Sequence, residues 1–119
     1  MADEGNLHRF GAYRKALQLF DFVVADLTLL LRHPELHRLV AQQHASADST
    51  AANLEEGYGR GSRKEYAQFL VIARGSAQET CGRYRRLRHW MAAETIDARA
   101  ALCDEIIAIL SKTVRTLRQ

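Results

Sequence analysis

Residues 57–65 read Gly-Tyr-Gly-Arg-Gly-Ser-Arg-Lys-Glu, and this stretch marks the boundary between two long helices. Its three glycines predict the end of the first helix, because glycine readily adopts the left-handed conformation that follows a helix C-terminus. Ser62 and Glu65 then have the spacing of a capping box, in which each side chain accepts a hydrogen bond from the other residue's backbone N–H. The sequence therefore predicts that a new helix begins at Arg63.

The region that precedes this boundary begins with a strongly amphipathic helix, expected over residues 7–31. Apolar residues recur there at alternating steps of three and four, the heptad spacing of a helix seam. The seam consists of Phe10, Tyr13, Leu17, Phe20, Val24, Leu27 and Leu31. A second apolar stripe, Ala16, Val23 and Leu30, lies beside it. Together the stripes are wider than one core-facing surface requires, which favours burial against another subunit.

Three further helices follow from the same periodicity. Pro34 suits the first turn of a helix over residues 34–58, since its missing N–H would be unpaired there anyway. Another is expected over residues 63–92, and a last one starts near Thr95 as N-cap, with Asp97 in its first turn. Because every connection is short, the sequence predicts an all-α protein, an antiparallel up-down-up-down four-helix bundle. Residues 1–119 form one domain, with residues 1–6 expected to be disordered.

Length and composition agree with a small globular protein. The chain has 119 residues, 47% of them hydrophobic, with one proline and seven glycines. Its start is acidic and polar, unlike a secretory signal. The most apolar stretch, residues 16–31, is interrupted by Asp21 and Asp26 and is shorter than the roughly 20 residues of a membrane span. We therefore expect a cytoplasmic protein with no membrane contact, in which Cys81 and Cys103 are buried small side chains.

Catalytic and metal-binding motifs are absent from the sequence. No Glu-x-x-His pair is present, as a di-iron bundle would need. His33 and His37 lack the glutamate that follows the first histidine of a zinc-protease helix. The glycines of residues 57–61 lack the Lys-Ser/Thr of a P-loop. We expect no metal, no cofactor and no catalytic residue.

One acid pair leaves two interpretations open. Glu56 and Glu79 are predicted on adjacent helices, where they could face each other with Arg60 or Arg74 as counter-ions. Such a pair could serve catalysis. A structural ion-pair or capping network is the favoured interpretation.

Positive charge is concentrated in the middle of the chain. The formal net charge is +3, yet residues 60–90 alone carry eight Lys/Arg against two Asp/Glu. The candidate nucleic-acid-binding residues are Arg60, Arg63, Lys64, Arg83, Arg85, Arg86 and Arg88. The last four are interleaved with aromatic residues, a combination that suits phosphate contact and base stacking. Basic residues are also favoured near a helix C-terminus by its dipole, and the aromatics could belong to the core.

The helix that begins after Gly61 offers a second hypothesis for anion binding. Its first N–H groups have no helical acceptors, and Arg60, Arg63 and Lys64 add charge beside them. The alternative is that Ser62 and Glu65 already use those donors while the arginines pair with Glu56. For a tight site, the alternative is favoured.

The segment Ser49-Thr-Ala-Ala-Asn-Leu-Glu-Glu-Gly-Tyr-Gly-Arg-Gly-Ser62, followed by Glu65, Phe69-Leu70, Ala73-Arg-Gly-Ser76 and Glu79, resembles the four helix bundle family of 23S rRNA-intervening-sequence proteins. The matching positions are Asn53, Glu56, Gly57, Gly59, Arg60, Ser62, Phe69, Leu70, Ala73, Gly75, Ser76 and Glu79. Leu54 and Glu55 depart from the usual Ile and Ala.

The resemblance implies a left-handed bundle that assembles as a ring, commonly a homopentamer. A related protein, the accessory variability determinant of diversity-generating retroelements, is a basic pentamer that binds a reverse transcriptase and nucleic acid. We therefore expect a non-enzymatic homo-oligomeric module that contacts RNA or DNA through basic faces, with a protein partner such as a reverse transcriptase. Gly75 and Gly82 are expected on a face where another backbone packs closely. The alternative is a structural or protein-interaction bundle with no nucleic-acid role.

Overall fold

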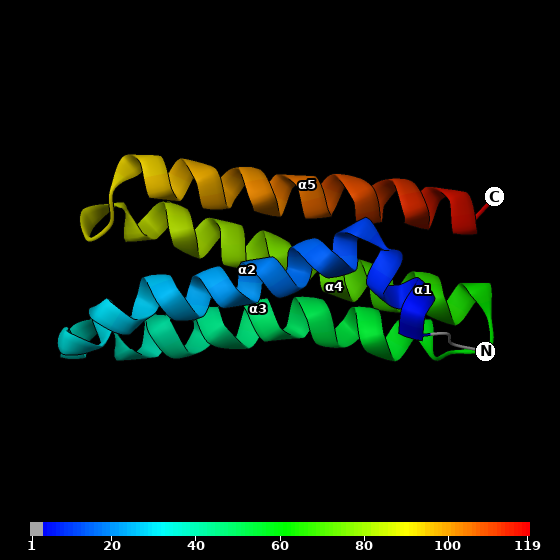
Figure 1. Cartoon of the computed structure of the whole chain (residues 1–119), viewed down its shortest axis with the longest axis horizontal. Helices are drawn as coiled ribbons and strands as arrows, with labels where there is room; N and C mark the ends of the chain where they lie inside the picture. The colour runs from blue at the N-terminus through cyan, green and yellow to red at the C-terminus, as the bar shows by residue number, and fades with distance from the viewer. Residues whose placement is uncertain (1–3) are drawn as a thin grey trace.

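The structure is a computed structural model that describes residues 4–119, and it is an antiparallel bundle of four long helices (Figure 1). The helices are α1 (Glu4–Arg9), α2 (Gly11–Thr28), α3 (His37–Tyr58), α4 (Arg63–Arg86) and α5 (Ala93–Leu117), with short 3-10 turns at Leu29–Arg32, Pro34–Leu36 and Leu87–His89. Each long helix packs against the next, and α5 closes the bundle against α2. The molecule measures 44 × 21 × 19 Å. The predicted all-α, up-down-up-down fold is confirmed.

The first expected helix is divided in two at Phe10. This residue has an extended backbone, with φ −69° and ψ 117°, so α1 ends before it and α2 begins at Gly11. The guanidinium of Arg14 donates to the carbonyl oxygens of His8 and Arg9, which satisfies the end of α1. Residues 4–6 belong to α1, where we expected disorder, and residues 1–3 lie outside the described part of the chain.

Helix α2 buries the second apolar stripe, and the predicted seam is only partly correct: Tyr13 and Leu27 are buried, whereas Phe10 and Phe20 are partly buried against the core. The buried residues are Ala12, Tyr13, Ala16, Leu19, Val23 and Leu27. Leu17, Val24 and Leu31 are 36%, 42% and 49% exposed. This rotation also places Asp26 where it can be paired inside the bundle. Both stripes have heptad spacing, so the spacing alone did not discriminate between them.

Helices α3 and α4 pack most closely of all, and Gly57 explains how. A Cβ atom at Gly57 would lie 2.6 Å from Cβ of Phe69, so only glycine fits. Gly57 is buried inside α3 and, like every described glycine, has no positive φ. The predicted left-handed glycine ending is therefore wrong: α3 needs glycine for a close helix approach.

The ends of α4 and α5 test the predicted caps. Ser62 caps α4, since its Oγ accepts from the backbone N–H of Glu65 at 3.1 Å. The other half of the predicted capping box differs, because the Glu65 carboxylate accepts from the Ser62 hydroxyl at 3.4 Å instead of from its backbone N–H. Helix α4 ends at Arg86 instead of Ala92, because Leu87–His89 tightens into a 3-10 turn. The N-cap position of α5 is Ala92 instead of Thr95, and Glu94 supplies the acid in its first turn. Between residues 4 and 119, no helix combines the length and apolar character of a membrane span.

Candidate nucleic-acid interface

The candidate basic residues fall into two clusters at opposite ends of α4. We call Arg60, Arg63 and Lys64 the leading cluster, and Arg83, Arg85, Arg86 and Arg88 the trailing cluster. At a rise of 1.5 Å per residue, Lys64 and Arg86 are about 33 Å apart along the helix. The bundle is 44 Å long, so the clusters occupy its two ends and do not form one surface.

Arg60 is the member of the leading cluster that forms an ion pair within residues 4–119. Its guanidinium lies 3.5 Å from the carboxylate of Glu56 and stacks over the ring of Phe69 at 5.0 Å. The predicted Glu56–Arg60 ion pair is therefore confirmed. Together with the Ser62 cap, this pairing supports the alternative in which the start of α4 is already satisfied, rather than a tight phosphate site.

Arg63 and Lys64 instead lie beside the end of the chain. Arg63 donates to the carbonyl oxygen of Thr116 on α5 at 3.1 Å. Arg63, Lys64 and Arg118 line a hollow of about 400 Å³ with Ala67, Gln68 and Leu117. Arg118 was not among the predicted residues. The antiparallel pairing of the last two helices could have revealed it, because that pairing brings the chain's end to the start of α4.

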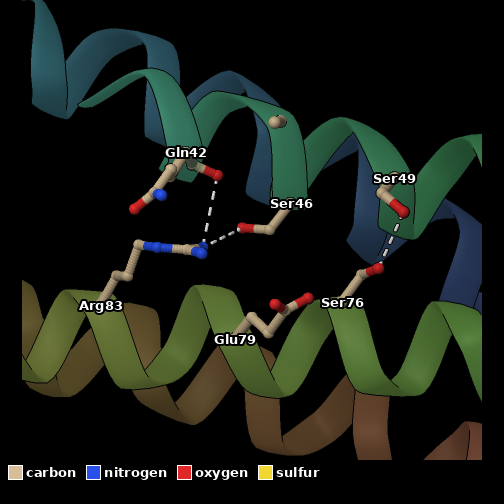
Figure 2. A pocket seen from close by; sticks show the side chains of 7 residues that line it. Gln42, Ser46, Ser49, Ser76, Glu79 and Arg83 are labelled. Carbon is tan, nitrogen blue, oxygen red and sulfur yellow. Dashed lines mark hydrogen bonds between the residues drawn. The ribbon is translucent and has the colours of Figure 1, made fainter. Parts of the chain in front are cut away.

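Arg83 differs from the rest of the trailing cluster because its side chain forms hydrogen bonds with α3. Figure 2 shows it reaching across from α4, where its NH1 donates to Oγ of Ser46 at 2.9 Å and to the carbonyl oxygen of Gln42 at 3.3 Å. Its side chain is half-buried. Arg83 thus links two helices, and its guanidinium is less available to contact nucleic acid.

The other trailing residues stay exposed at the end of the bundle. Arg85 approaches Asp104 on α5 at 4.0 Å, the limit of an ion pair. Arg88 donates to the backbone carbonyl of Arg85 at 3.2 Å. The guanidinium of Arg86 passes over Gly82, 3.3 Å from where a Cβ atom would sit. These weakly engaged guanidinium groups can contact phosphates.

The aromatic and apolar residues near the trailing cluster differ in their exposure to solvent. Tyr84 and Leu87 are fully buried in the core. Burial, and then its hydrogen bond to Asp26, raises the pKa of the Tyr84 phenol far above its usual range. His89 and Trp90 are exposed, and their rings meet edge to face at 5.6 Å. Only these last two aromatics are accessible to a ligand.

A polar groove of about 260 Å³ lies between α3 and α4 (Figure 2). Ser49 and Ser76 share a hydrogen bond of 2.8 Å in its wall, and Asn53 donates to Oγ of Ser49 at 3.0 Å. Glu79 and Arg83 also line it. Because the groove carries both charges, it is not a simple phosphate site.

Glu56 and Glu79 do not face each other. Glu79 lies near Ser46, whose hydroxyl bonds that of Thr80 at 2.7 Å. Ser46 is ten residues from Glu56 on α3, or about 15 Å along the helix. Arg74, the other proposed counter-ion, donates to Ser111 of α5 at 3.3 Å. The acid pair that could have served catalysis is therefore not formed.

Cysteine and metal chemistry find little support in residues 4–119. Both cysteines are buried, as expected. Burial, followed by the neighbouring Cys81, raises the pKa of the Cys103 thiol to about 12. A thiol with a raised pKa is a poor nucleophile at neutral pH, because little thiolate is present. No group of three potential metal ligands comes together in this part of the chain.

The fold and the site define a class: small up-down helical bundles with basic ends. The family model for the 23S rRNA-intervening sequence protein matches residues 8–112. The chain therefore belongs to the 23S rRNA-intervening sequence protein family. No curated protein matches the chain.

Proposed function

We propose that this protein is a non-enzymatic, oligomeric binding module that contacts RNA or DNA through the two basic ends of its bundle. The observation that carries the proposal is the exposure of cations at both ends. They are Arg63, Lys64 and Arg118 at one end, and Arg85, Arg86 and Arg88 at the other. Exposed guanidinium and ammonium groups bind phosphates by charge and release counter-ions, without needing a shaped pocket.

Assembly into a homo-oligomeric ring, most simply a pentamer, is part of the proposal. Leu17 and Val24 on α2, with Leu31 in the 3-10 turn that follows it, leave an apolar stripe uncovered within one chain. Gly75 on α4 has no neighbouring atom within 4 Å of the place where a Cβ atom would sit, so another helix has room to approach there. A ring would repeat each basic end in every subunit, and repeated weak contacts raise overall affinity.

The apolar stripe of α2 also favours the second candidate function. A structural or protein-interaction bundle would use the same stripe to bind a protein, with no nucleic-acid role. The reverse transcriptase partner that the family resemblance implies would be a ligand of this kind. The two functions differ in one measurable property, which is salt-dependent binding of nucleic acid.

The test compares charge removal at the exposed cations that carry the proposal with charge removal at Arg60 and Arg83, which contact Glu56 and α3. Arg63→Gln, Lys64→Gln and Arg118→Gln are combined in one variant, and Arg85→Gln, Arg86→Gln and Arg88→Gln in another. Each should weaken RNA and DNA binding and make the slope of log K against log salt shallower by about two to three. The control is Arg60→Gln with Arg83→Gln, which removes two guanidinium groups that the protein itself engages, and should change binding little. If the wild type binds no nucleic acid at low salt, the proposal is wrong and the interaction bundle replaces it.

A further inference from the structure

The sole tryptophan of the chain stands beside a hollow at the trailing end of the bundle. The hollow has a volume of about 280 Å³ and lies between the end of α2 and the turn that connects α4 to α5. Its walls include Leu29, Leu30, Arg32, Trp90, Met91 and Ala92. We call it the Trp90 hollow.

The walls of the hollow offer apolar and aromatic surface to solvent. Leu29 is 68% exposed and Trp90 is 38% exposed. The backbone N–H of Trp90 donates to the carbonyl of Leu87 at 2.9 Å, and its ring meets that of His89 edge to face. An exposed indole offers a large, flat face on which a base can stack.

Charge at the hollow favours an anionic ligand. Asp26 lines it, but both carboxylate oxygens accept hydrogen bonds from Arg99, and one accepts from Tyr84 as well. The acid is thus neutralised by a neighbouring cation. Arg32 is exposed at the rim, where its Nε lies 3.5 Å from His33, and no carboxylate within residues 4–119 forms an ion pair with it.

We propose that the Trp90 hollow binds an unpaired nucleobase, which stacks on the indole of Trp90 while Arg32 contacts an adjacent phosphate. This inference rests on the proposed function and narrows its ligand to single-stranded RNA or DNA. Every base has a π-face, so stacking on an aromatic side chain is tolerant of sequence. A base inside a duplex is already stacked between its neighbours and must be extruded first.

Because Trp90 is the sole tryptophan, its fluorescence reports the hollow directly. The full-length wild type is titrated with four end-labelled probes: a short single-stranded RNA, the same sequence as DNA, its duplex, and a strand of abasic nucleotides with the same number of phosphates. Anisotropy of the label measures binding, and tryptophan emission measures stacking. Both base-containing single strands should quench Trp90, whereas the duplex and the abasic strand should bind by charge without quenching.

Variants separate stacking from charge. Trp90→Ala should weaken single-strand affinity about ten-fold, as expected for one lost base stack, and leave duplex affinity unchanged. Trp90→Phe, the matched control, keeps an aromatic face and should retain most of the affinity. Arg32→Gln should reduce the salt slope by about one, whereas Arg83→Gln, which removes an engaged guanidinium, should not.

Four results would overturn the inference. If anisotropy shows binding but tryptophan emission is not quenched, or is quenched equally by the abasic strand, then no base stacks on Trp90. The proposed function is unaffected by either result. If tryptophan emission shifts with protein concentration in the absence of any probe, the ligand of the hollow is a second copy of the chain. If no probe binds at low salt, both the inference and the proposed function are wrong.

Discussion

Tyr84 on α4 donates its phenol hydrogen to Oδ2 of Asp26 on α2, at 2.8 Å, and this contact lies at the centre of a three-helix network. The same carboxylate accepts from Nε and NH2 of Arg99 on α5, at 2.8 and 3.1 Å. Arg99 also stacks over the ring of Phe22 at 3.7 Å. The Asp26 side chain is only 10% exposed. One nearly buried carboxylate thus joins three of the long helices, and its partners offset the cost of removing it from water.

The first prediction is that Tyr84→Phe lowers the free energy of unfolding by about 1–2 kcal/mol. The ring keeps its packing while the nearly buried acceptor loses one donor. Urea unfolding measures the change. Arg99→Ala and the double variant complete a cycle: because both residues act through Asp26, their effects should not add. Simple additivity would show that the network is not coupled.

The second prediction concerns alkaline pH and the buried thiol of Cys103. Its pKa is raised from 9.0 to about 12, chiefly by burial. In the unfolded chain the thiol ionises near its ordinary value, so above it the unfolded state holds fewer protons than the folded state. Stability therefore falls as pH rises through this window and is fully present below it. Tyr84 and Tyr66, whose pKa values burial also raises, contribute in the same direction.

Cys103→Ala removes one of these groups and should make the loss of stability between pH 9.0 and about 12 less steep. Chemical unfolding at a series of pH values measures the slope, and the comparison is made within each protein because the substitution also changes packing. Equal slopes for variant and wild type would show that this thiol ionises alike in both states.

The helix boundary at Ser62 could be predicted because it depends on residues that are close together in the sequence. The buried face of α2 could not, because it depends on contacts between residues that are far apart in the sequence. A capping box depends on residues three apart, so it can be recognised directly. The rotation of α2 about its axis depends on Asp26 meeting Tyr84, 58 positions away. Two stripes with the same heptad spacing compete for the core, and only such distant partners decide between them.

The candidate site was also only partly predictable from the sequence. Charge counting within residues 60–90 identifies the cations named in both clusters, because positive charge is read directly from the sequence. It does not distinguish Arg83, whose hydrogen bonds reach α3, from Arg86, which stays at the surface. It also omits Arg118, which joins the leading cluster only when α4 and α5 are packed together.

The third prediction is that Ser62→Ala lowers stability by about 1 kcal/mol, the usual effect of a lost N-cap. Ser62 Oγ accepts from the N–H of Glu65 at 3.1 Å, and alanine leaves that donor to water. Thr95→Ala is the control, because α5 begins at Ala93 and Thr95 lies inside the helix. Thermal melting should move for Ser62→Ala and stay nearly constant for Thr95→Ala. Equal shifts would contradict the assigned caps.

The fourth prediction contrasts two glycines, beginning with Gly57. Its added Cβ would lie 2.6 Å from Cβ of Phe69, which cannot rotate away. Gly57→Ala should therefore force α3 and α4 apart and cost about 1–3 kcal/mol, as overpacking does. Urea unfolding measures the loss, and a stability equal to the wild type would show that the two helices are less closely packed than described.

Gly75→Ala should have the opposite effect on the single chain, because no atom lies within 4 Å of the added carbon. In a helix interior, alanine is favoured over glycine by about 1 kcal/mol, so the variant bundle should unfold at higher urea. A ring that packs another backbone on this face would be obstructed by the same methyl group. Light scattering should then detect a smaller assembly at equal protein concentration. A variant that is more stable yet assembles like the wild type would place the subunit contact away from Gly75.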